Sequence, residues 1–154
     1  MLIEKIIDLT EINDNSSSRK KDTVFLEWYE LAKKVLRKTS QYGLDVGIKL
    51  PLDSRHLRDG DIIFVSDDLI LTVSVNLCKC LSIIWNNPFE LAKISYETGN
   101  RHAPLFISQN NERELLIPYD PIIFDLFKKQ FCHVTEVESR LTRPLSSNIA
   151  AHSH

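Results

Sequence analysis

The sequence predicts an α+β fold made of two small domains and a tail. An all-β domain is expected over residues 1–75, a β-α-β-β-α-β domain over residues 76–144, and a flexible segment over residues 145–154. The first half predicts strands because apolar and polar residues alternate in short runs that end in turn residues. The second half predicts two helices between strands, because an Asx-Pro helix start occurs twice among strand-like runs.

Short strand-like runs separated by turn residues make up the first half. Arg58-Asp59-Gly60-Asp61 has the composition of a tight turn, and Ser66-Asp67-Asp68 lies at the centre of an apolar hairpin pattern. The polar run 13–22 has no periodicity and predicts an exposed loop, whereas residues 31–39 fit a helix and a strand equally well. Strands are expected over residues 2–9, 23–30, 44–50 and, as a hairpin, 62–75.

The first helix of the second half is marked by its cap residues. Asn87 is a favoured N-cap residue, Pro88 suits the first helical position, and Glu90 completes a capping box. We expect the helix to continue to about Thr98 and to end at Gly99, because glycine readily adopts the left-handed conformation that terminates helices.

The second helix repeats the same start signal at Asp120-Pro121 and continues through residues 122–131, with two lysines near its negative end. Strand-like runs flank the two helices at residues 78–85, 103–109, 114–119 and 133–141. The resulting order, β-α-β-β-α-β, is that of a ferredoxin-like fold.

The composition argues against several classes of protein. The chain has 19 Lys and Arg against 21 Asp and Glu, so its formal charge of −2 provides no broad basic field for nucleic acid. No apolar run reaches the roughly 18 residues of a transmembrane helix, and the acidic residues Glu4, Asp8 and Glu11 do not suit a secretory signal. Three cysteines, an odd number, predict reduced thiols in a cytoplasmic protein.

The usual enzyme signatures are absent from the sequence. It has no nucleophile elbow, no phosphate-binding P-loop, no H-E-x-x-H zinc motif and no glycine-rich dinucleotide loop. Periodicity places no pair of carboxylates together in a cleft. The sequence therefore gives no support for an enzyme.

Histidines are the residues most able to carry chemistry, because neutral imidazole binds nickel, zinc and copper. His152 and His154 lie two residues apart at the end of the chain, where they could close on one metal ion or have no role. His102 ends the run Gly99-Asn100-Arg101-His102, which predicts either an exposed, fixed corner for a ligand or a plain connection from helix to strand. His56 fits a solvated side chain, and a metal ion shared by Cys132 and His133 is not expected, because adjacent side chains on a strand diverge.

Cys78 and Cys80 are two residues apart on a predicted strand, so their side chains are expected on the same face. A C-x-C pair can bind a soft metal, but no second ligand pair at zinc spacing accompanies it. Ordinary strand thiols are the simpler interpretation, and a soft-metal site is the alternative.

The run Tyr96-Glu97-Thr98-Gly99-Asn100-Arg101-His102-Ala103-Pro104-Leu105 resembles the UreE urease accessory proteins, a family of nickel metallochaperones with a G-N-R-H segment at this place. Leu57-Arg58-Asp59-Gly60-Asp61-Ile62-Ile63 is similar to the family's L-R-x-G-D-hydrophobic segment, and the terminal histidines are also typical of the family. Together these segments extend over nearly the whole chain in the expected order.

The resemblance implies an N-terminal domain similar to a chaperone peptide-binding domain and a ferredoxin-like metal-binding domain. It implies a homodimer joined through the C-terminal domains, with His102 as the metal ligand beside its dimer mate and His152 and His154 completing the site. The implied ion is Ni²⁺, for which Zn²⁺ or Cu²⁺ can substitute in vitro. The implied partners are the urease accessory GTPase UreG and the urease apoprotein, with no membrane or nucleic acid.

The sequence also departs from the family. Its tail has two histidines where some relatives have many, and residues 114–120 lack the further histidine pair that some members carry. About one metal ion per dimer is therefore expected, as for a carrier rather than a store. Two other classes remain open: a general zinc, copper or nickel buffer or sensor without a dedicated client, and an interaction module whose histidines are incidental.

Overall fold

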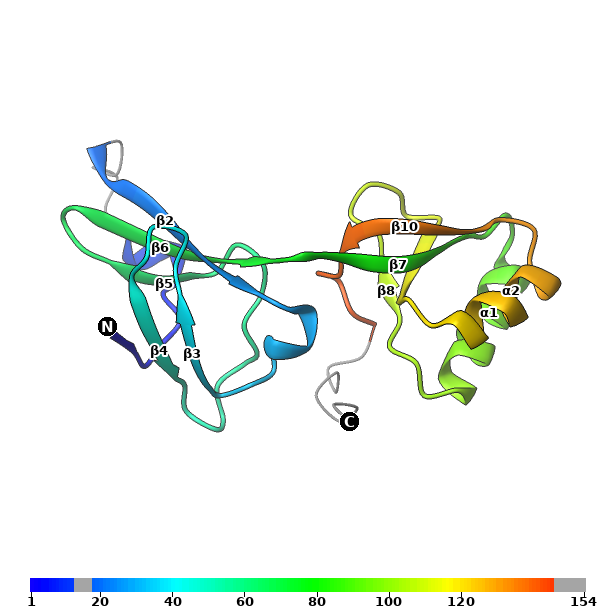
Figure 1. Cartoon of the computed structure of the whole chain (residues 1–154), viewed down its shortest axis with the longest axis horizontal. Coiled ribbons are helices and arrows are strands. Elements are labelled where there is room, and N and C mark those ends of the chain that lie inside the picture. The colour runs from blue at the N-terminus through cyan, green and yellow to red at the C-terminus, as the bar shows by residue number, and fades with distance from the viewer. Residues whose placement is uncertain (13–17, 146–154) are drawn as a thin grey trace. The chain divides into compact units, whose positions relative to one another are not determined.

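A computed structural model of the chain describes residues 1–12 and 18–145, and it confirms the α+β fold class (Figure 1). The chain forms two compact units and passes from one to the other between Asn76 and Leu77. Within the described residues, neither helix has the length and apolar character needed to cross a membrane.

The first unit contains two three-stranded sheets, each with one parallel and one antiparallel pair of strands. The sheet orders are β1-β4-β3 and β2-β6-β5. The elements are β1 (Leu2–Ile3), η1 (Leu9–Glu11), β2 (Lys20–Leu26), η3 (Trp28–Glu30), β3 (Val35–Thr39), β4 (Asp45–Lys49), β5 (Ile62–Val65) and β6 (Leu69–Val75), where η marks a 3-10 helix.

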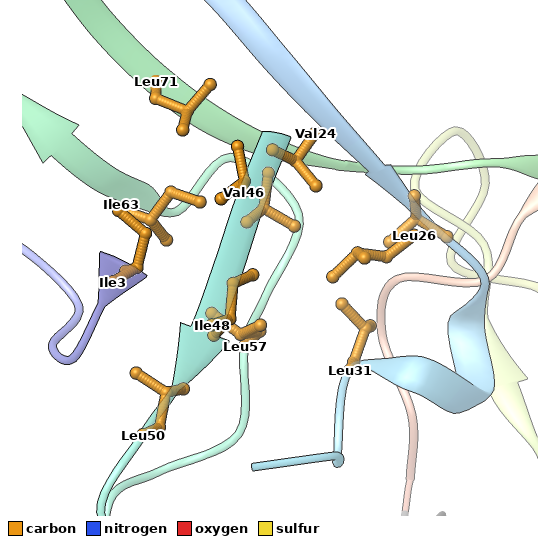
Figure 2. Close-up of a cluster of buried hydrophobic side chains, with 12 residues drawn as sticks. Ile3, Val24, Leu26, Leu31, Val46, Ile48, Leu50, Leu57, Ile63 and Leu71 are labelled. Carbon is orange, nitrogen blue, oxygen red and sulfur yellow. The ribbon is translucent and has the colours of Figure 1, made fainter. Parts of the chain in front are cut away.

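One apolar core joins these two sheets (Figure 2). Val46 and Ile48 come from β4 and lie in the same cluster as Val24 and Leu26 of β2. Leu57, from the loop before the tight turn, is also buried there. Successive side chains of a strand point to opposite faces of the sheet, so alternate residues of these strands form the core.

The predicted hairpin over residues 62–75 is confirmed, with the amide of Ser66 donating to the carbonyl of Leu69 across its turn. Three expectations for this unit were wrong in extent. The strand expected over residues 23–30 ends at Leu26, and residues 28–30 form the 3-10 helix η3 instead. The strand expected over residues 2–9 ends at Ile3, and Ile7 then makes only an isolated bridge to Ile62. Strand β2 begins at Lys20, inside the predicted polar loop, because residues 20–26 pair in parallel with β6.

The second unit has the β-α-β-β-α-β order that the sequence predicts. Its elements are β7 (Leu77–Ile84), α1 (Pro88–Asn100), β8 (Phe106–Ile107), β9 (Glu114–Pro118), α2 (Pro121–Gln130) and β10 (Val134–Arg140). All neighbouring strands are antiparallel in the order β10-β7-β9-β8, which is the ferredoxin-like arrangement. Both helices lie on one side of this sheet (Figure 1). Ile94, Ile123 and Phe127 from the helices form one buried cluster with Leu81 and Ile83 of β7.

After β10 the chain returns to the opposite edge of the same sheet. Leu141 is fully buried, and Pro144 then forms a bridge with Phe106 of β8. The amide of Leu145 donates to the carbonyl of Leu105 at 2.9 Å. This segment places the last described residue beside the strand that follows α1.

Candidate metal centre

His102 lies at the end of α1, in the turn that closes the helix. Its amide donates to the carbonyl of Gly99 at 3.0 Å, and the amide of Ala103 donates to the carbonyl of Thr98 at 3.1 Å. This pair of bonds is the Schellman arrangement, which places one left-handed residue just after the helix. That residue is His102, with φ of 55°, and among the described residues it alone has a positive φ without being glycine.

The sequence-based expectation that Gly99 ends the helix in a left-handed conformation was therefore wrong. Gly99 is helical, and α1 continues to Asn100. The helix is anchored by Thr98, which is buried and donates its hydroxyl to the carbonyl of Ile94 at 2.7 Å. A histidine in the left-handed region is uncommon, and strained positions of this kind cluster at functional sites.

The predicted exposed corner is present at His102. The imidazole is exposed to solvent, whereas Ala103 and Leu105 on its C-terminal side pack against the core of the second unit. The backbone on its other side is held by the helix-closing bonds. The side chain thus projects from a backbone that is fixed on both sides.

The outward face of α1, which leads to this corner, is unusually apolar. Phe89 is 77% exposed and Tyr96 is 69% exposed, seven residues apart on one side of the helix. Ala92 and Gly99 lie on the same side and are also exposed. We call these four residues the α1 stripe.

Nothing in the described chain requires glycine at position 99. A Cβ atom built on it would meet no atom within 4 Å, and its φ is not positive. Glycine inside a helix lowers stability by about 0.5–1 kcal/mol relative to alanine. Its absence of a side chain suits close approach by another molecule better than any contact within this chain.

The structure does not test His152 and His154, which lie outside the described residues. It does define where the segment that carries them begins, because Leu145 is bonded to Leu105, three residues after His102. A span of three residues is at most about 11 Å, and the seven residues from Leu145 to His152 extend to about 25 Å. The chain length therefore permits these histidines to reach His102.

The other candidate ligands are dispersed. His133 and Cys132 are exposed just after α2, and His56 is half-buried in a loop of the first unit. In residues 1–12 and 18–145, no three His, Cys, Asp or Glu side chains gather as a metal cluster. The sulfur atoms of Cys78 and Cys80 lie 3.6 Å apart, so the expectation that they share a face is confirmed.

The second motif of the resemblance organises the first unit rather than a reactive site. Gly60 adopts φ of 85° in the tight turn, and Asp59 accepts a hydrogen bond from the amide of Val75 at 2.7 Å. Asp61 accepts two hydrogen bonds from the guanidinium of Arg55, each at 2.8 Å. These bonds raise the pKa of Arg55 above its usual value, because they favour its charged form. The sequence pattern predicts the turn itself, but it does not indicate that Val75 and Arg55 bind its aspartates.

Comparison with known proteins matches both halves of the chain. The family models for the N-terminal and C-terminal domains of the UreE urease accessory protein match residues 3–76 and 78–154. A urease accessory protein UreE of Acetivibrio thermocellus is 36% identical, with 100% of this chain and 97% of the relative covered.

Two further relatives carry the same description. That of Flavobacterium johnsoniae is 32% identical over 90% of this chain and 82% of the relative. That of Lysinibacillus sphaericus is 30% identical, with 100% of both chains covered. The chain belongs to the UreE urease accessory protein family.

Proposed function

We propose that the protein is a nickel metallochaperone for urease maturation, which captures Ni²⁺ at His102 and delivers it to the assembling urease active site. One observation carries the proposal: an exposed imidazole on a rigid, left-handed corner at the end of α1. The family, whose members are described as urease accessory proteins, supplies the urease connection.

The proposed site forms between two copies of the chain. Imidazoles of His102 from two subunits related by a two-fold axis would form an isologous pair. The α1 stripe supports this arrangement, because its exposed Phe89 and Tyr96 lie on the helix that ends at His102. Gly99, which nothing in the described chain requires, would let the partner approach close to the ligand. The homodimer is thus proposed to join through the C-terminal domains.

Two imidazoles leave Ni²⁺ largely hydrated and exchangeable, so additional ligands are needed for tighter binding. In the proposal His152 and His154 supply them, which the bond between Leu145 and Leu105 supports, because seven residues of chain are long enough to span the distance to His102. Detachment of these ligands then lowers the ligand count and releases the ion. A structural zinc site, by contrast, is closed by four fixed ligands.

Imidazole ligands do not select nickel by themselves. By the general affinity order, Cu²⁺ binds such a site at least as tightly as Ni²⁺, and Zn²⁺ also binds it. Selectivity must then come from the metal supply and from the partner. The proposed stoichiometry is about one ion per dimer.

The proposed partners are the urease accessory GTPase UreG and the urease apoprotein complex, and the proposed location is the cytoplasm. In this role the protein binds and transfers an ion and catalyses no reaction. Phe25 and Tyr29 are 38% and 42% exposed and are candidates for a docking surface, whereas Trp28 packs against the core.

Transfer to the GTPase separates this function from general metal buffering. Nickel-loaded protein is mixed with metal-free UreG, and nickel is quantified in each after separation. We expect a complex and nickel transfer for the wild type, little transfer from His102→Ala, and wild-type transfer from the exposed control His133→Ala. If nickel moves from the protein to UreG no faster than it moves to an unrelated chelator, the protein acts as a buffer instead.

A further inference from the structure

Two thiols occupy fixed positions on a central strand of the second unit. Cys78 and Cys80 lie on β7, which is paired with β10 on one side and β9 on the other. Cys80 faces Val137 of β10 and Pro118 of β9. The paired strands hold the backbone, so both thiols stay on one face of the sheet, with their sulfur atoms 3.6 Å apart.

This separation suits one metal ion bound to both sulfurs. With metal–sulfur bonds of about 2.3 Å, two sulfurs on one ion lie between about 3.8 Å and 4.6 Å apart as the angle opens from tetrahedral to linear. Because two-coordinate binding is close to linear, the sulfurs of Cys78 and Cys80 would move about 1 Å further apart, through rotation about their Cα–Cβ bonds. A disulfide fits less well, because residues two apart on a strand have Cα atoms about 6.6–6.8 Å apart, the upper limit for a disulfide. Neither cysteine forms a disulfide.

The number of ligands selects the kind of ion. Among the described residues, no third His, Cys, Asp or Glu joins the pair in a metal-binding group. Zinc requires four ligands, and Ni²⁺ also takes four or more, whereas soft monovalent Cu(I) is satisfied by two thiolates. Cys80 is fully buried and Cys78 half-buried, so the site excludes water from one sulfur and is reached through the other.

We propose that Cys78 and Cys80 form a two-sulfur site for Cu(I), separate from the imidazole site. On binding, each thiol gives its proton to the solvent and each sulfur forms one bond to the ion. No electron is transferred, and the ion replaces the contact between the two sulfurs. Without the ion, the hydrogen bond with Cys78 and then burial raise the pKa of the Cys80 thiol, which keeps it protonated.

The test uses the full-length, reduced protein under anaerobic conditions. Cu(I) is supplied as its bicinchoninate complex, and transfer to the protein is followed by loss of the dye complex. We expect one Cu(I) per chain, with only sulfur neighbours in X-ray absorption. Cys78→Ser should lower the affinity by about 100-fold or more, because a hydroxyl is a poor ligand for a soft ion. Cys132→Ser is the matched control, since Cys132 is an exposed thiol outside the pair.

Three outcomes would overturn the site: unchanged Cu(I) affinity in Cys78→Ser, nitrogen neighbours in the wild-type spectrum, or an equal loss in Cys132→Ser. Cys80→Ala is a second variant, and its folding is verified by circular dichroism. If it keeps the wild-type affinity for Cu(I), the proposal is wrong. His102→Ala should keep full Cu(I) binding, so this test is independent of the nickel proposal. Loss of Cu(I) in His102→Ala would assign the ion to the imidazole site instead.

Discussion

The amide of Ala103 donates to the carbonyl of Thr98 at 3.1 Å, and this bond closes the end of α1 around one residue, His102. The closing turn requires a left-handed backbone, which glycine adopts at least cost. In this chain the position is occupied by the histidine proposed as the metal ligand. The helix ending and the candidate ligand therefore coincide, and the orientation of the imidazole depends on the integrity of the turn.

His102→Gly should separate stability from metal binding. Relief of the left-handed strain should raise the free energy of unfolding by about 0.5–1 kcal/mol, while loss of the imidazole removes tight nickel binding. Urea denaturation without metal at equal protein concentrations, with His102→Ala as the comparison, checks the stability change. A variant less stable than His102→Ala would show that the backbone is not strained there.

The α1 stripe should control dimerisation. Tyr96→Lys places a charge on the exposed apolar face and should shift the protein from dimer to monomer in sedimentation velocity at micromolar concentration. Glu97→Lys changes a neighbouring position on the flank of the same helix and should leave the dimer intact. If Tyr96→Lys sediments like the wild type, the α1 stripe is not the proposed dimer interface.

The parts of the fold that could be predicted from sequence depend on local bonds. Asn87 accepts from the amide of Glu90 at 2.9 Å, and Asp120 accepts from the amide of Ile123 at 3.0 Å, as their cap patterns indicate. These bonds join residues three apart, so the sequence contains both partners in one short window. The capping box expected at Glu90 was wrong, because its carboxylate accepts from the amide of Asn86 and not of Asn87.

The parts that could not be predicted depend on distant partners. Lys20 belongs to a strand because β6 lies beside it, and Leu145 is bonded to Leu105, 40 residues earlier. At the site, G-N-R-H identified His102, but glycine's preference for left-handed turns pointed to the wrong residue. That the left-handed residue is His102 followed only from the hydrogen bonds that end α1.

Acid should destabilise the first unit partly through Glu30. Burial opposes its charge, but hydrogen bonds from Lys38 and from the amide of Glu27 outweigh burial and lower the pKa of Glu30. The folded state therefore binds fewer protons than the unfolded state, so this stabilisation is present above about pH 4.5 and is lost as the pH falls through the folded value. Glu30→Gln should show a smaller loss of stability between pH 6 and pH 3 in urea denaturation. An unchanged pH dependence would refute a role for the ion pair with Lys38.

Nickel affinity should fall steeply below about pH 6.5, because ligation requires neutral imidazole. The slope against pH should approach the number of imidazoles bound, two to four. Titrations between about pH 5.5 and 8.5, with and without thiol alkylation, measure this dependence. An affinity that still rises at about pH 8.5, or loss of binding after alkylation, would instead assign nickel to Cys78 and Cys80. Free thiols titrate near about 8.5, and the hydrogen bond with Cys78 and burial raise the pKa of Cys80 further.

Calorimetric titration of Ni²⁺ into the full-length protein tests the central claim most directly. The wild type and the exposed-histidine control His133→Ala should each bind tightly at about one ion per dimer. His102→Ala should lose this tight site, by about 100-fold or more in affinity, with an unchanged circular dichroism spectrum. Wild-type affinity and stoichiometry in His102→Ala would contradict the assignment of His102 as the nickel ligand.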